Sequence, residues 1–199
     1  MAAGSAAGPS TADRRWATKS GSESQPDGPA AGSSPTATEL FTIGHSNVAA
    51  DKLIGLLRQH QIEVLVDVRS VPYSRHNPQF NHKRIAGAVA AAGIDYTYAG
   101  EQLGGRPADP ACYEDGKVQY DRVAAQSGFQ EALERLIALA GRQRIAIMCA
   151  EEDPRHCHRH HLIAQSLLRR GVVVRHIRGD GRLEEAQMDA PMPRQPPLL

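Results

Sequence analysis

The fold of this chain is predicted from one stretch, Arg144-Ile-Ala-Ile-Met-Cys149-Ala-Glu-Glu-Asp-Pro-Arg-His-Cys157-His158-Arg159. A short apolar run ends on Cys149, an acidic loop follows, and Cys157 begins a segment with the pattern of a helix. In an α/β protein this is the carboxyl end of a buried strand, where ligands are usually bound. We therefore predict a functional site around Cys149.

Outward from that stretch, strand patterns and helix patterns alternate along the chain. Apolar or alternating runs predict strands at 39–44, 62–70, 94–98, 144–150 and 172–177. Helical periodicity predicts helices at 49–61, 81–92, 128–141 and 158–170. Parallel neighbours need crossover connections, so the alternation predicts a single three-layer α/β domain. Its mostly parallel sheet has about five strands, with helices on both faces.

Composition divides the 199 residues into three parts. Residues 1–38 are rich in Ala, Gly, Ser and Pro and cannot bury enough apolar surface to offset the entropy lost on ordering. We therefore predict a disordered extension at 1–38, the folded domain at 39–186, and a loose Pro-rich tail at 187–199. The loop at 101–113 is rich in Gly and Pro and is predicted to be irregular and lid-like.

Charge and cysteine count exclude several classes of protein. The net charge of +1 provides no field for bulk attraction to nucleic acid or to an anionic membrane. No apolar run approaches the roughly 20 residues that span a bilayer, and the N-terminus lacks the apolar centre of a secretory signal. We predict a cytoplasmic protein without a membrane partner. The chain has three cysteines. An odd number of cysteines in a reducing compartment argues against a disulfide framework.

Right-handed crossovers place the carboxyl ends of all parallel strands at one edge of the sheet. That edge is predicted to collect a histidine as general acid or base, an aspartate that orients it or accepts a proton, a cysteine as nucleophile, and a glutamate. The predicted catalytic residues are His45, Asp67, Cys149 and Glu151. The loops beside them carry hydroxyl, aromatic and cationic side chains that grip phosphate or stack on a base, and two glycines that permit close approach of a ligand. The predicted substrate-binding residues are Asn47, Arg69, Ser70, Tyr73, Ser74, Gly104, Gly105, His158 and Arg159.

Each of these residues also has a structural interpretation. Cys149 in a buried strand is a small hydrophobic residue. His45 and Asp67 can form a hydrogen-bonded pair that holds two loops together. Arg159 forked onto Glu151 or Asp67 is as consistent with a structural clamp as with a grip on substrate.

Two classes of enzyme with a reactive cysteine, the phosphatases and the rhodaneses, share parts of the sequence pattern around Cys149. Cys149 and Arg155 have the Cys-x5-Arg spacing of a phosphatase loop. The acids that follow Cys149 would repel phosphate and raise the pKa of that cysteine, which argues against a phosphatase. A rhodanese-like layout is disfavoured too, because the glycine-rich anion loop is missing in both comparisons.

A zinc site is a further alternative, because zinc accepts thiolate and imidazole ligands. Cys149, Cys157, His158 and His45 could supply four of them. Cys149 and Cys157 are eight residues apart, however, and do not form a Cys-x2-Cys knuckle. We therefore assign no metal site and no cofactor from the sequence, and keep a metal-binding structural or regulatory protein as an alternative.

Five motifs occur in order along the chain, at 42–47, 66–74, 77–81, 103–105 and 148–159. Together they resemble the motif set of the bacterial and archaeal family called domain of unknown function 488 (DUF488), over about residues 40–181. The resemblance implies a single compact α/β domain. It implies no activity.

Our first functional hypothesis is a small enzyme whose crevice holds an anionic substrate, such as a nucleotide. The second is a nucleic-acid or nucleotide binding module without catalysis, and the third is the metal-binding protein. The binding module would use the basic residues Arg69, Arg75, Lys83, Arg84 and Arg106. The oligomeric state is not predicted.

Overall fold

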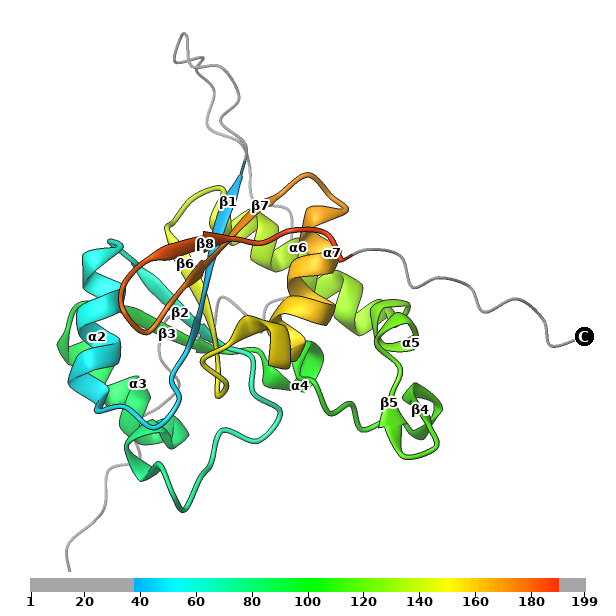
Figure 1. Cartoon of the computed structure of the whole chain (residues 1–199), viewed down its shortest axis with the longest axis horizontal. Helices are drawn as coiled ribbons and strands as arrows, with labels where there is room; N and C mark the ends of the chain where they lie inside the picture. Colours follow the sequence, from blue (N-terminus) through cyan, green and yellow to red (C-terminus); the bar gives the residue numbers. More distant parts are fainter. Residues whose placement is uncertain (1–37, 190–199) are drawn as a thin grey trace, which may run out of the picture.

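A six-stranded sheet in the order β3-β2-β6-β1-β7-β8 forms the centre of the structure, a computed structural model that describes residues 38–189 (Figure 1). β8 alone is antiparallel, pairing with β7. The strands are β1 (Glu39–Gly44), β2 (Val64–Asp67), β3 (Asp95–Tyr98), β6 (Ile145–Cys149), β7 (Val173–Ile177) and β8 (Leu183–Glu185). The predicted α/β class is confirmed, with six strands in the sheet where about five were expected.

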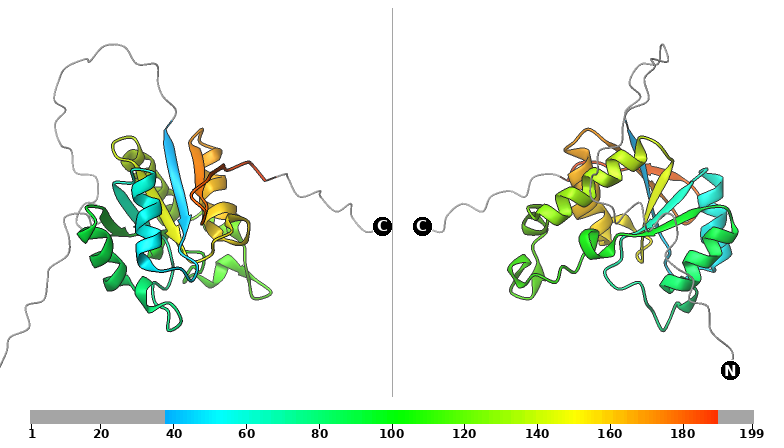
Figure 2. Two further views of the ribbon diagram at one scale, coloured as in Figure 1. Left: turned by 60° about the vertical axis from the view of Figure 1, so that its left-hand side comes forward. Right: turned by 180° about the vertical axis from the view of Figure 1, so that it is seen from behind.

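Helices cover both faces of this sheet (Figure 2). α2 (Ala50–Gln59) and α3 (His82–Ala91) pack on one face. The other face carries α6 (Ser127–Ala140), the π-helix η4 (Arg159–Ala164) and α7 (Gln165–Leu168). Shorter elements are the helices α4 (Gly100–Leu103) and α5 (Tyr120–Ala124), the 3-10 turns η1 (Pro78–Phe80), η2 (Pro110–Cys112) and η3 (Pro154–His156), and the hairpin β4 (Tyr113–Glu114) and β5 (Lys117–Val118).

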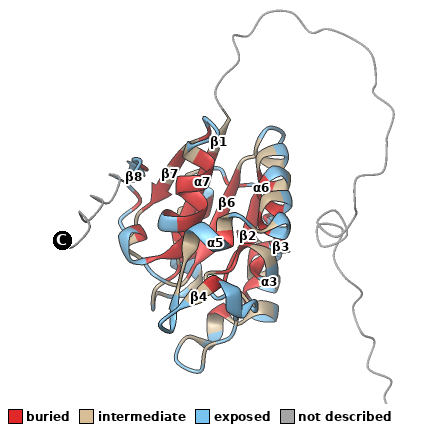
Figure 3. Cartoon of the chain, turned by 90° about the vertical axis from the view of Figure 1, so that its right-hand side faces the viewer, coloured by how far each residue is buried: buried red, intermediate tan, exposed pale blue. Residues whose placement is uncertain are grey.

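The central strands are buried on both sides, which explains their nearly continuous apolar sequences (Figure 3). In β6, Ile145, Ile147 and Cys149 join the core under α6 and η4, while Ala146 and Met148 join the core under α2 and α3. Successive side chains of a strand point to opposite faces, so this alternation is expected. Cys149 therefore points from the sheet toward the helical layer that contains Cys157.

The register aligns the carboxyl ends of three strands. Gly44 of β1 is paired with Cys149 of β6, and Asp67 of β2 with Met148 of β6. The backbone continues this alignment beyond the strands, because the His45 N–H donates to the Cys149 carbonyl at 3.0 Å. The first, second and fourth predicted strands thus end at one edge, as the crossover rule predicts.

Three local predictions are revised by the structure. β8 was missed because it is only three residues long, charged, and exposed at all three positions. The helix predicted at 158–170 begins as a π-helix. The loop at 101–113, predicted to be irregular, contains most of α4 and all of η2.

Parts of the predicted domain organisation lie beyond the described residues. The predicted extension lies outside them apart from Thr38, and the predicted tail apart from 187–189. Within 38–189, no helix combines the length and the apolar composition that crossing a membrane requires.

His176 makes the stability of the domain depend on pH. It lies buried in β7, hydrogen-bonded to Thr42 Oγ1 at 2.7 Å and to His160 Nδ1 at 3.1 Å. Burial, with a smaller contribution from the charge of Arg159, lowers the pKa of His176 from 6.5 to about 3. Between these values only the unfolded chain takes up the proton, so this contribution to stability is present above pH 6.5 and is lost on acidification.

We expect the free energy of unfolding to fall by about 2 kcal/mol between pH 7 and pH 5 because of His176 alone. The replacement His176→Asn should flatten this pH dependence, measured as the urea midpoint at each pH. His156→Asn is the control, because the side chain of His156 is 78% exposed. Parallel pH profiles for wild type and His176→Asn would contradict the prediction.

Candidate functional site

A pocket of about 490 Å³ opens at the carboxyl edge of the sheet. Its wall comes from the loop after β2, the loop after α4, the start of α5, and the segment from the end of β6 to the start of η4. The lining residues are Arg69, Ser70, Val71, Tyr73, Gly105, Arg106, Tyr120, Cys149, Ala150, Glu151, His156, Cys157 and His158. Seven of the thirteen residues predicted to be catalytic or substrate-binding are among them.

Cys149, Cys157 and His158 are buried residues of the pocket wall. Their side chains are 6%, 4% and 9% exposed, respectively. The Nδ1 atom of His158 lies 3.6 Å from Cys149 Sγ and 3.7 Å from Cys157 Sγ. The three atoms lie within 4.8 Å of one another. We call these residues the thiol–imidazole cluster.

The orientation of the His158 ring is set by a backbone carbonyl. Its Nε2 lies 3.2 Å from the Val68 carbonyl oxygen, which can only accept, so Nε2 carries a hydrogen. The opposite nitrogen, Nδ1, therefore faces the two sulfur atoms. Gly105 lies against the other side of the ring, where a Cβ atom would come within 2.7 Å of His158 Cγ. The sequence predicted close approach of a ligand at Gly105, whereas in the structure it is the His158 ring that approaches this glycine.

The two thiols differ in their proton affinity. The thiol of Cys149 donates to Cys157 Sγ, and this hydrogen bond lowers the pKa of Cys157. The Arg159 backbone N–H, 3.5 Å from Cys157 Sγ, also favours the charged form. The same hydrogen bond and burial raise the pKa of Cys149. The shifts of the two pKa values are opposite in direction, so Cys157 is the more acidic of the two thiols.

Asp67 lies behind the pocket and is fully buried. Arg69 binds it in a bidentate manner, with Nε to Oδ1 at 2.9 Å and Nη2 to Oδ2 at 2.6 Å, and the hydroxyl of Tyr96 adds a bond at 2.8 Å. Arg69 Nη1 lies 3.1 Å from His45 Nε2. The guanidinium of Arg69 thus stands between Asp67 and His45, and no hydrogen bond joins these two side chains directly.

Both ring nitrogens of His45 have partners. Nδ1 lies 2.7 Å from the Ser46 carbonyl oxygen and therefore donates to it, and Nε2 accepts from Arg69. The ring stacks on Phe80 with 4.2 Å between centroids, and burial lowers the pKa of His45 to about 4. His45 does not line the pocket; its catalytic role, like that of Asp67, stays a prediction.

Arg159 is a clamp on the backbone. It is fully buried and donates to the carbonyl oxygens of Glu151 and Glu152, not to Asp67. A Cβ atom on Gly44 would lie 1.7 Å from the Glu151 oxygen, so β1 must end in glycine for this loop to pack. The side chain of Glu151 is exposed at the pocket, and its carboxylate makes no hydrogen bond or ion pair with the described residues.

The remaining predicted residues lie around the pocket without lining it. Asn47 is exposed, and Ser74 Oγ accepts from two backbone N–H groups of its own loop. A Cβ atom on Gly104 would come within 2.3 Å of Ser70 Oγ. The same Ser70 oxygen accepts from the Arg106 backbone N–H at 2.9 Å.

Sequence reasoning grouped Cys157 with Cys149 only as a possible zinc ligand, and it did not place Arg106, Tyr120 and His156 at this pocket. Cys157 had a signal, since it follows Cys149 across a short loop that can turn back. Arg106 follows the two glycines of the predicted loop, and it was named only for the binding module. Tyr120 is remote from every motif.

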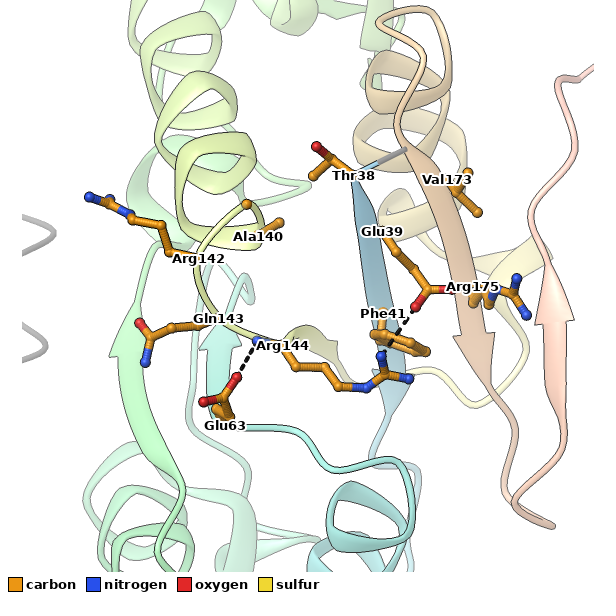
Figure 4. A pocket seen from close by; sticks show the side chains of 11 residues that line it. Thr38, Glu39, Phe41, Glu63, Ala140, Arg142, Gln143, Arg144, Val173 and Arg175 are labelled. Carbon is orange, nitrogen blue, oxygen red and sulfur yellow. Dashed lines mark hydrogen bonds and ion pairs between the residues drawn. The ribbon is translucent and has the colours of Figure 1, made fainter. Parts of the chain in front are cut away.

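A larger hollow of about 650 Å³ lies at the opposite, amino edge of the sheet (Figure 4). Several of its charged groups are paired. Glu39 pairs with Arg144 and Arg175, and Arg144 also lies 4.1 Å over the ring of Phe41. The residues that line it include no cysteine or histidine, so we take the smaller pocket as the candidate site.

Comparison with known proteins gives one match. A family described as "Domain of unknown function DUF488" matches residues 49–166, more than half of the chain. This range is shorter than the predicted resemblance but includes the whole thiol–imidazole cluster. The curated proteins and the solved structures contain no match to the chain.

Proposed function

Because the chain belongs to the DUF488 family, a domain of unknown function, its activity has to be argued from its pocket, and we propose a small enzyme that acts on an anionic small molecule bound over the thiol–imidazole cluster. One observation carries this proposal: Cys149, Cys157 and His158, from two segments of the chain, converge on the wall of one pocket. Convergent polar groups in a pocket at the carboxyl edge of an α/β sheet are the usual form of an active site.

The rim of the pocket favours an anionic substrate with a ring. The Arg106 guanidinium is exposed and makes no hydrogen bond or ion pair with the described part of the chain, so it is free to bind a phosphate or carboxylate. Tyr73 and Val71 are 64% and 62% exposed beside it and offer a stacking surface. The volume of about 490 Å³ suits a ligand of nucleotide size.

Glu151 completes the set of groups that can react. Its unpaired carboxylate lies on the same wall as the cluster and can accept or return a proton. Arg69 lines the pocket too, but Asp67 neutralises its charge. This pairing also weakens the alternative of a nucleic-acid binding module, which would need Arg69 as one of its five cations.

Replacement of Cys149 tests the proposal. We expect Cys149→Ser to reduce turnover by about 100-fold or more, because it removes a polarisable sulfur from the centre of the pocket while keeping the volume of the side chain. Turnover is measured by mass spectrometry on a panel of nucleotides, sugar phosphates and carboxylates, each paired with a neutral analogue.

The matched control is Cys112→Ser. Cys112 is also buried, at 1% exposed, but lies in η2 outside the pocket lining. It should retain turnover. Equal activity of Cys149→Ser and Cys112→Ser, or conversion of neutral analogues as fast as of anionic compounds, would reject the proposal.

A further inference from the structure

We propose that Cys149, Cys157 and His158 bind a divalent metal ion of the zinc type, whose fourth coordination position faces the pocket. The inference deepens the proposed function by naming its reacting centre, and it rests on that function only for the catalytic consequence. Binding of the ion requires no substrate. It can therefore be tested separately from turnover.

The spacing of the donor atoms fits such an ion. Zinc binds sulfur at about 2.3 Å and imidazole nitrogen at about 2.0–2.1 Å, so the sulfur–nitrogen edge of a regular tetrahedron measures about 3.6 Å. The two sulfur–nitrogen distances in the cluster are 3.6 and 3.7 Å. Two thiolates and one imidazole are soft and borderline donors, which select zinc or copper over calcium and magnesium.

The surroundings of His158 are those of a metal ligand. A coordinating histidine usually donates its second ring nitrogen to a carbonyl or carboxylate, which orients the ring and aims the lone pair at the ion. His158 Nε2 contacts the Val68 carbonyl at 3.2 Å, and Gly105 packs against the ring. The nitrogen that would bind the ion is therefore already directed at both sulfur atoms.

The fold also brings Cys149 and Cys157 together, although their eight-residue separation differs from that of a Cys-x2-Cys zinc knuckle. The turn η3 reverses the chain between Cys149 and Cys157, and Arg159 holds the intervening loop by its carbonyl groups. The π-helix η4 begins immediately after His158. π-Helical segments are frequent at functional sites, because the wider turn redirects side chains. The eight-residue step therefore forms one compact three-ligand site.

A second group of potential ligands serves as a contrast. His160, His161 and Asp189 also lie close together, but each histidine is hydrogen-bonded to Asp189 at 3.0 Å. The side chains of His161 and Asp189 are 39% and 47% exposed. These hydrogen bonds join η4 to the segment after β8, which explains why the three side chains lie together. It carries no proposal.

Three protein ligands with an open fourth position are the arrangement of catalytic zinc sites. A water molecule at that position would lose a proton to the Glu151 carboxylate. The resulting hydroxide would form a bond to the electrophilic carbon or phosphorus of the substrate. The bond to the leaving group would then break, and Glu151 would return the proton to that group. The reaction class is hydrolysis, without any change in oxidation state.

The test is the metal content of the full chain, purified without chelator or metal-affinity resin. We expect about one zinc per chain by elemental analysis. The variants Cys149→Ala, Cys157→Ala and His158→Ala should each lose at least about 10-fold in zinc affinity, measured by competition with a chromogenic chelator. Cys112→Ala and His161→Ala are the matched controls and should keep the stoichiometry and affinity of wild type.

Cobalt substitution of wild type gives a second readout that does not depend on the folding of any variant. A thiolate-to-cobalt charge-transfer band with tetrahedral visible bands is expected. Three results would overturn the inference. The first is the absence of such a band, and the second is a purified chain that contains no zinc and binds none on titration. The third is a loss of zinc affinity in the control variants equal to that in the cluster variants. If the protein turns over substrate without bound metal, the zinc site is rejected and the proposed enzyme would use thiolate chemistry. If the protein binds zinc but converts none of the compounds, the proposed enzyme is rejected and the zinc site is retained.

Discussion

The variant Asp67→Ala is expected to lower the free energy of unfolding by about 3–5 kcal/mol, because it leaves the Arg69 charge buried and unpaired. Asp67 is fully buried and Arg69 is 6% exposed. The guanidinium also donates to the Phe80 carbonyl at 2.8 Å and contacts His45, so it cannot leave for solvent without breaking both contacts. The effect is measured by urea unfolding followed by far-UV circular dichroism.

The chain supplies a matched control. Asp180 and Arg182 have the same Asp-x-Arg spacing, and Asp180 accepts from the Arg182 backbone N–H at 3.0 Å and from Arg182 Nε at 2.7 Å. Their side chains are 53% and 82% exposed, so Asp180→Ala should leave the urea midpoint close to that of wild type. Equal costs of the two aspartate replacements would show that burial does not determine the role of Asp67.

A double variant separates charge from packing. Replacing Asp67 by Ala and Arg69 by Met together should be less costly than Asp67→Ala alone, since no charge is then buried without a partner. A double variant at least as unstable as Asp67→Ala would assign the loss to packing around Asp67 instead.

The variant Gly44→Ala is expected to cost about 3 kcal/mol or more and to disturb the pocket. The added Cβ would lie 1.7 Å from the Glu151 carbonyl oxygen and 2.9 Å from Arg159 Nη1. The nearest atom belongs to the backbone, and the Arg159 clamp holds it, so a small side-chain movement cannot relieve the overlap. The thermal midpoint measures the loss, and accessibility of Cys149 to a thiol reagent reports on the pocket.

Gly87→Ala is the opposite case. Gly87 lies inside α3, and nothing lies within 4 Å of the Cβ atom that the replacement adds. Alanine should raise the stability there by about 0.5–1 kcal/mol through its helix propensity and the lower entropy of the unfolded chain. A Gly44→Ala protein as stable as wild type would mean that the loop at Glu151 can move away from β1.

Local sequence patterns were sufficient to predict the layers of the domain and the edge of the sheet at which the candidate site lies. Alternation of apolar residues is a local signal, and the length between strands requires crossovers. These two rules were enough to bring Gly44, Asp67 and Cys149 to one edge. A short, charged edge strand such as β8 lacks the apolar alternation and was therefore missed.

The pairing of side chains at that edge could not be predicted from the sequence and is seen in the folded domain alone. Arg69 separates Asp67 from His45, and Arg159 binds two carbonyl groups in place of a carboxylate. Cys157 and Cys149 share one imidazole although their spacing in the sequence argued against it. These pairings depend on differences of a few tenths of an ångström between elements and on the loss of water from charged groups. Neither quantity is encoded in periodicity or spacing, because both arise only when the layers have packed.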